Sequence, residues 1–153
     1  MKNYLKIFLV VGLLFIASGC GKTVSNNSSV EDLLDVYMEG FKNADVDKML
    51  SVYPDFAKDY YGKYVTEENV RNALDNYGDN IKLSYDITGK EKLSSEELNQ
   101  LNEEIKQTFT NYVLPSDCYK ISGTTEAKGS KNKNMGTIKN MWYCNFNDTW
   151  RLF

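Results

Sequence analysis

The chain has 153 residues, a net charge of −3 and no histidine. A length of this order suits one domain with one hydrophobic core. The acidic balance argues against nucleic-acid binding, which needs a basic surface. The lack of histidine removes Ser-His-Asp, Cys-His and His-ligated zinc chemistry.

The N-terminus has the features of an export signal. Lys2 and Lys6 precede an uncharged apolar run over 7–17, and small residues follow it. A basic start, an apolar stretch of about 7–15 residues and small residues before a cut are typical of a cleaved signal peptide. The run is too short to span about 30 Å of hydrocarbon as a helix. We therefore expect residues 1–19 to be a signal peptide.

The end of this signal, Ala17-Ser18-Gly19-Cys20, resembles the lipobox of bacterial lipoproteins, in which small residues precede an obligatory cysteine. Ala17 departs from the leucine most common in that family. The resemblance implies a diacylglyceryl group on Cys20, which would hold the protein at the extracytoplasmic face of the cell membrane. The alternative is an ordinary secretory signal followed by a chance cysteine. Loss of Lys2 and Lys6 would change the net charge from −3 to −5.

Small polar residues follow Cys20, so residues 20–27 are expected to be a flexible tether and residues 28–153 a single domain. Ser28 and Glu31 predict a capping box that starts a helix. The apolar residues that follow recur on one helix face: Val30, Leu33, Leu34, Tyr37 and Phe41.

Further helices are predicted from their caps. Asp45 suits the start of a short helix that ends before Pro54, and an aromatic stripe from Phe56 to Tyr64 suggests another, broken at Gly62. Thr66 and Gly78 bound a further helix. Ser94 and Glu97 form a second capping box, ahead of a helix over 94–108.

Strands are predicted where the period changes to two. Residues 81–87 alternate apolar and polar side chains. The C-terminal third reads as strands over 118–125, 135–146 and 149–153, with a polar loop at 128–133 and a tight turn at Asn147-Asp148. The order predicts an α+β domain.

Cys118 and Cys144 are the remaining cysteines. A hairpin centred on Lys131 places them directly opposite one another, and it pairs Tyr119 with Tyr143 on the other face. Opposite residues of a non-hydrogen-bonded pair have Cα atoms about 4.5 Å apart, within disulfide range. We predict a disulfide, which export would preserve. Two neighbouring free thiols are the alternative, and a redox role is disfavoured because there is no C-x-x-C motif.

The residues Tyr37 to Asp45, Met49 to Pro54 and Asp148 to Leu152 resemble the opening helix, second helix and closing strand of the nuclear-transport-factor-two-like superfamily, also called SnoaL-like or cystatin-like. The resemblance implies N-terminal helices packed on a curved antiparallel sheet, a cone with a pocket inside, and a weak homodimer through the sheet. Tyr85, Tyr119 and Trp142 are the expected pocket-lining residues. The helix over 94–108 departs from the simplest family pattern.

These observations favour a non-enzymatic domain that binds an unknown ligand or protein partner, with no catalytic residue, metal or cofactor. Asp86, the candidate base, is expected on the outer face, where burial cannot raise its pKa. A SnoaL-like lyase or isomerase and a scaffold of an envelope complex are the alternatives. Two surfaces offer weaker binding hypotheses: an aromatic patch of Tyr60, Tyr61 and Tyr64 that faces a glycan, and the cationic loop 128–133.

Overall fold

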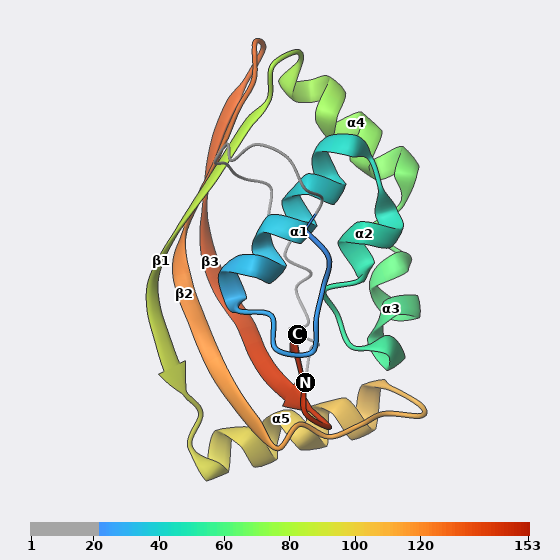
Figure 1. Cartoon of the computed structure of the whole chain (residues 1–153), viewed down its shortest axis with the longest axis vertical. Coiled ribbons are helices and arrows are strands. Elements are labelled where there is room, and N and C mark those ends of the chain that lie inside the picture. Colours follow the sequence, from blue (N-terminus) through green and yellow to red (C-terminus); the bar gives the residue numbers. More distant parts are fainter. Residues whose placement is uncertain (1–21) are drawn as a thin grey trace.

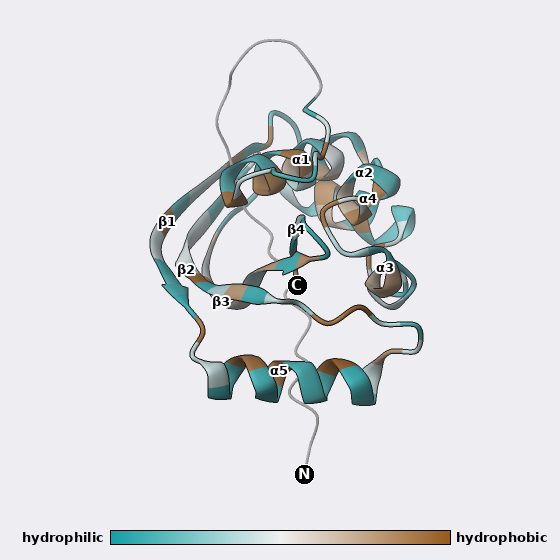
Figure 2. Cartoon of the chain, turned by 60° about the horizontal axis from the view of Figure 1, so that its bottom comes forward, coloured by the Kyte–Doolittle hydropathy of each residue, from teal (hydrophilic) through white to brown (hydrophobic). Residues whose placement is uncertain are grey.

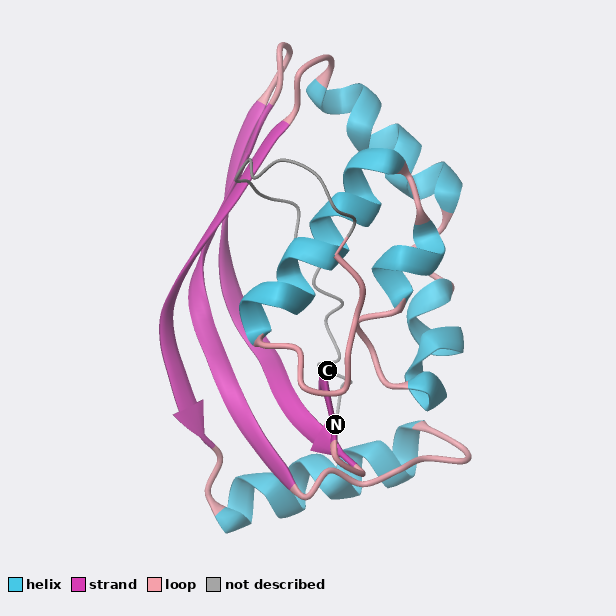
Figure 3. Ribbon diagram, viewed as in Figure 1, coloured by secondary structure: helices cyan, strands magenta, loops and turns pink. Residues whose placement is uncertain are grey.

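A computed structural model describes residues 22–153. The predicted signal peptide and Cys20 lie outside the described residues. Helices α1 to α4 come first, then strand β1, helix α5 and strands β2 to β4 (Figures 1 and 3). Their bounds are α1 Val30–Asn43, α2 Val46–Leu50, α3 Asp55–Gly62, α4 Glu67–Tyr77, β1 Lys82–Lys92, α5 Ser95–Thr108, β2 Asp117–Lys128, β3 Lys133–Phe146 and β4 Thr149–Leu152.

The strands form one antiparallel sheet in the order β1-β2-β3-β4, and its curved face holds α1 with α2, α3 and α4 beyond it (Figure 1). Register shifts at Ile87/Gly89 and at Ile121/Gly123 interrupt the first two ladders. Such bulges bend a strand and increase its twist. Gly123 is required there, because a Cβ atom would lie 2.1 Å from the carbonyl oxygen of Asp86. The predicted α+β architecture is confirmed.

Most of the predicted caps are confirmed, and one is displaced. Thr66, Asp45 and Ser94 cap α4, α2 and α5 as expected. The capping box of α1, however, is made by Ser29 and Asp32. Ser28 is unavailable because its hydroxyl accepts from the amide of Ser25 at 2.9 Å, in the turn that precedes the helix.

The core has two parts. The first lies between α1 and the concave face of the sheet; among its fully buried members are Leu33, Leu83 and Ile138. The second lies under α5, on the opposite face of the lower sheet, and joins Ile105 and Phe109 to both cysteines and to Phe153 (Figure 2). Strand alternation separates the two, because successive side chains point to opposite faces.

The segment 22–27 was expected to be a free tether, and the structure places it on the domain instead. Lys22 forms ion pairs with Asp32 and Asp35, and Val24 packs against the first core. The carbonyl of Asn26 accepts from the amide of Trp150 at 2.8 Å. The segment is held by both side chains and backbone, which its polar composition does not reveal.

Candidate binding site on the concave face of the sheet

Tyr85 lies in the middle of strand β1, and its side chain reaches helix α1. Its hydroxyl donates to Asp35 Oδ1 at 3.0 Å, and the carbonyl oxygen of Glu31 lies 3.3 Å away. Burial, with the nearby Asp35 carboxylate, raises the pKa of Tyr85 above its usual range. Asp35 also pairs with Lys22 at 2.7 Å, and its side chain is 39% exposed. Tyr85 therefore ties the sheet to α1, and its hydroxyl is already committed.

Lower on the same face, Tyr119, Tyr143 and Trp150 form an aromatic shelf. Tyr143 stacks on Trp150 with ring centroids 4.6 Å apart, and Tyr119 lies 5.9 Å from Trp150. Tyr143 is buried and donates to the carbonyl of Ser28 at 2.8 Å, whereas Tyr119 and Trp150 are partly exposed. The hydrogen bond of Tyr143 thus fixes one ring of the shelf, while Tyr119 and Trp150 are partly exposed to solvent.

A single lysine lies over the shelf. The Nζ of Lys90 is 4.6 Å from the ring centre of Tyr143 and 4.9 Å from that of Tyr119. Aromatic faces attract cations, which holds the ammonium in place. No ion pair of Lys90 with a carboxylate is found among residues 22–153. Its charge is therefore available to an anion that approaches the rings.

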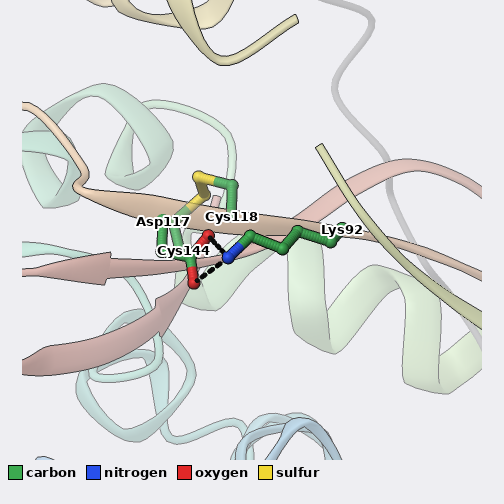
Figure 4. Close-up of a disulfide and its surroundings, with 4 residues drawn as sticks. All are labelled: Lys92, Asp117, Cys118 and Cys144. Carbon is green, nitrogen blue, oxygen red and sulfur yellow. Dashed lines mark hydrogen bonds and ion pairs between the residues drawn. A yellow bond between two sulfur atoms is a disulfide. The ribbon is translucent and has the colours of Figure 1, made fainter. Parts of the chain in front are cut away.

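Polar groups flank the shelf. Asn145 lies opposite Trp150 in the register, so both side chains are on one face. Its Oδ1 is buried and has no hydrogen-bond partner within the described chain. Beside it, Lys92 and Asp117 form an ion pair at 3.1 Å (Figure 4). A buried acceptor without a donor destabilises the fold, so the Asn145 oxygen is available to accept a hydrogen bond from a ligand or water.

Trp142 was predicted to line the same pocket, and this is wrong. It lies next to Tyr143 in β3 and packs against the second core, on the opposite face. The backbone of Trp142 pairs with Phe153 in both directions at 2.8 Å. Tyr85 and Tyr119, the other two candidates, do face the concave side with the first core.

The predicted disulfide is present. Cys118 and Cys144 are joined, with Cα atoms 4.1 Å apart, and both side chains are fully buried under α5 (Figure 4). The pairing of Tyr119 with Tyr143 and of Ile121 with Met141 also follows the predicted register. One register accounts for all three pairs, but it differs by one residue from the register beside the loop, where Lys128 pairs with Lys133. The shift between Ile121 and Gly123 makes up this difference, so the predicted pairs also depend on a bulge that the sequence did not reveal.

The weaker candidates are placed as follows. Asp86 is exposed, as expected for the outer face. Tyr60 and Tyr61 pack against the second core and are only partly exposed, while Tyr64 is 40% exposed. The rings of Tyr60 and Tyr64 lie 6.0 Å apart. Within residues 22–153 no helix is long and apolar enough to cross a membrane, and no group of three or more His, Cys, Asp or Glu side chains gathers to hold a metal.

Lys90, Trp150, Asp35 and Asn145 are the site residues that sequence reasoning missed. The tight turn at Asn147-Asp148 was recognised, and continuing its register would have placed Trp150 beside Tyr143 on the concave face. Lys90 lies in β1 beyond the predicted strand end, after the register shift. No sequence signal indicates that Asp35 receives the tyrosine.

No protein-family model matches the chain, and no curated protein matches it significantly. Among solved structures, it is similar to an NTF-2 like protein of unknown function from Shewanella oneidensis MR-1. The TM-score is 0.46 and the sequence identity 17%, over 80% of this chain and 90% of that one.

Proposed function

We propose that the protein is a lipoprotein, anchored through Cys20 at the extracytoplasmic face of the cell membrane, whose domain binds a ligand without catalysing a reaction. The basic start, apolar run and Ala17-to-Cys20 motif support the anchor. The disulfide is in keeping with an oxidising compartment.

The observation that carries the binding role is the aromatic shelf with Lys90 above it. Rings stack on flat or cyclic ligands, and the unpaired ammonium favours an anionic group. We therefore assign to this site a ring-shaped ligand that bears a carboxylate or similar anion, such as an acidic sugar.

A non-catalytic role is supported by the state of the nearest candidate base. Asp35 is paired with Lys22 and accepts a hydrogen bond from Tyr85, so its carboxylate is already engaged by the protein. Tyr85, its neighbour, has a raised pKa and a hydroxyl engaged in hydrogen bonding. A lyase or isomerase would instead require a buried carboxylate that faces the ligand.

Anchoring is tested by expressing the chain and its Cys20→Ala variant in bacteria. We expect the parent protein in the membrane fraction, with a mass spectrum showing diacylglyceryl on Cys20, and the variant without lipid. An unmodified Cys20 in the exported protein would contradict the anchor and leave the binding role to be judged by its own experiment.

Binding at the shelf is tested with glucuronate and glucose, followed by the tryptophan fluorescence and NMR spectra of the full chain in detergent. We expect glucuronate to bind with a Kd on the order of 1 mM, and glucose more weakly. Lys90→Ala should remove the preference for the acid, whereas Lys139→Ala, a matched lysine exposed on β3, should keep it. Equal responses to both sugars, or an unchanged preference in Lys90→Ala, would refute the assignment.

A further inference from the structure

A second hollow lies on the other side of strand β4 from the shelf. It has a volume of about 420 Å³ and is bounded by the start of α3, the loop after α5 and the turn between β3 and β4. Arg151 lines it, and the register pairs Arg151 with Cys144, on the face opposite Trp150. Volumes of about 300–1,000 Å³ are typical of small-molecule sites.

The inner wall of this groove is apolar. Phe56 and Phe146 line it with ring centroids 5.6 Å apart, and Val113 adds an aliphatic surface. Both rings belong to the second core, which the disulfide ties to the sheet. The wall is therefore preformed, which lowers the entropic cost of binding.

Polar residues complete the lining of the groove. Asn111, Asn147 and Thr149 are among them, and their side chains can donate as well as accept hydrogen bonds. Arg151 adds a guanidinium that is held in place by its Nη1, which donates to the carbonyls of Ser25 at 2.9 Å and Trp150 at 2.7 Å. Its Nη2 and Nε have no hydrogen-bond partner among the described residues.

The charges of the groove favour an anion. Asp55 is the only acidic residue in its lining, and its carboxylate pairs with Lys58 at 2.6 Å. The Asp55 side chain is 95% exposed, so water screens its charge. Arg151 is partly buried, where its charge is less screened. Arg151 forms no direct ion pair with Asp55 in the described part of the chain, although the Asp55 carboxylate is near enough to attract the guanidinium charge.

We propose that this groove is a binding site for a carboxylate carried on an apolar or aromatic body about the size of an acylated amino acid. The carboxylate would accept from the free nitrogens of Arg151 and from the neighbouring amides, and the body would lie on Phe56, Phe146 and Val113. A small organic acid and the C-terminus of an apolar peptide share this chemistry. This site is separate from the shelf and does not depend on the function proposed for it.

The test uses N-acetyl-L-phenylalanine, its uncharged amide, and the peptide N-acetyl-Ala-Ala-Phe, each titrated into the full chain in detergent and followed by NMR. We expect both acids to shift the signals of Asn111, Asn147 and Thr149, and the amide to bind at least tenfold more weakly. Stronger binding of the peptide than of the single acylated residue would identify a C-terminus as the source, and the reverse a small acid.

Variants test whether binding takes place in this groove. Val113→Trp fills the groove without changing its charge and should abolish binding, and Arg151→Gln should make the acid and amide bind alike. Lys63→Ala, in a separate hollow beside α2 and α3, is the matched control and should bind as the parent does. Equal affinity for acid and amide in the parent, unchanged binding in Val113→Trp, or no binding of either acid would overturn the proposal. The comparison in the parent decides even if Arg151→Gln fails to fold.

Discussion

On its concave face the sheet packs against α1 through an apolar core, and the hydroxyls of Tyr85 and Tyr143 add hydrogen bonds to α1 and to the turn before it. On the opposite face, under α5, it meets Ile105, Phe109 and a buried disulfide. The first contact therefore combines apolar packing with hydrogen bonds, while the second is apolar and cross-linked by the disulfide. The lower core holds β2 and β3 together at the residues adjacent to Tyr119 and Tyr143.

The largest expected effect comes from creating a cavity in each core, which tests whether both cores contribute to the stability of the domain. Leu33 is fully buried on the concave side and Ile105 under α5. Leu33→Ala and Ile105→Ala should each lower the free energy of unfolding by about 2–5 kcal/mol, since both leave a void. Urea unfolding followed by circular dichroism measures this. A loss below about 1 kcal/mol for Ile105→Ala would show that α5 is not part of the cooperative unit.

Removing the disulfide is the next largest change. The double variant Cys118→Ala, Cys144→Ala frees a loop of 26 residues' separation. On the chain-entropy model we expect a loss of roughly 3 kcal/mol, or a melting temperature lower by roughly 10 °C for a domain of this size. The parent protein, reduced while unfolded and then refolded in reductant, should show the same decrease in melting temperature. Matching melting curves for parent and variant would contradict the structural role.

Alkaline pH should weaken the concave core through Tyr37. Burial raises the pKa of Tyr37 from 10.0 to about 12. The unfolded chain then loses this proton first, so the stabilisation is complete below pH 10 and is lost as the pH rises through the folded-state pKa. The loss from this residue should be about 1.4 kcal/mol at pH 11.

Melting temperatures of the parent and of Tyr37→Phe at pH 8 and pH 11 measure this effect. The variant should lose less stability than the parent between the two values. An equal loss in both proteins would mean that Tyr37 does not contribute to the pH dependence.

The smallest expected changes in stability distinguish the hydrogen bonds of Tyr143 and Tyr85. Tyr143→Phe leaves the carbonyl of Ser28, a residue that is only 4% exposed, without its donor, so we expect a loss of about 1–2 kcal/mol. Tyr85→Phe frees an exposed carboxylate that water can solvate, and should cost under about 0.5 kcal/mol. Tyr112→Phe, on an exposed ring, is the control. A reversed order would show that the tie to Asp35 is the structural one.

Local sequence rules were sufficient wherever one residue decides a local conformation. The caps of α4 and α5 and the turn at Asn147-Asp148 follow from such rules, whereas the register that joins Cys118 to Cys144 also depends on the shift at Ile121/Gly123. The rule of alternation also contained the correct face for Trp142, because its neighbour Tyr143 was already placed on the other one. The prediction for Trp142 was wrong because adjacent residues of one strand point to opposite faces.

The rest could not be predicted because it depends on contacts between distant segments. The tie from Tyr85 to Asp35 joins residues 50 positions apart, and Lys90 reaches the rings only after the register shift in β1. The groove at Arg151 brings together α3, the loop after α5 and the last hairpin. None of these segments carries a local pattern that indicates its neighbour.

The placement of residues 22–27 has a mechanical consequence. A pull on the chain from before Lys22 acts first on that lysine's exposed ion pairs with Asp32 and Asp35. Once they yield, the load passes to strand β4, through the bond from Arg151 to the carbonyl of Ser25 and the backbone bond between Trp150 and Asn26. Force from the N-terminal side is therefore shared between the last strand of the sheet and helix α1, which follows the segment.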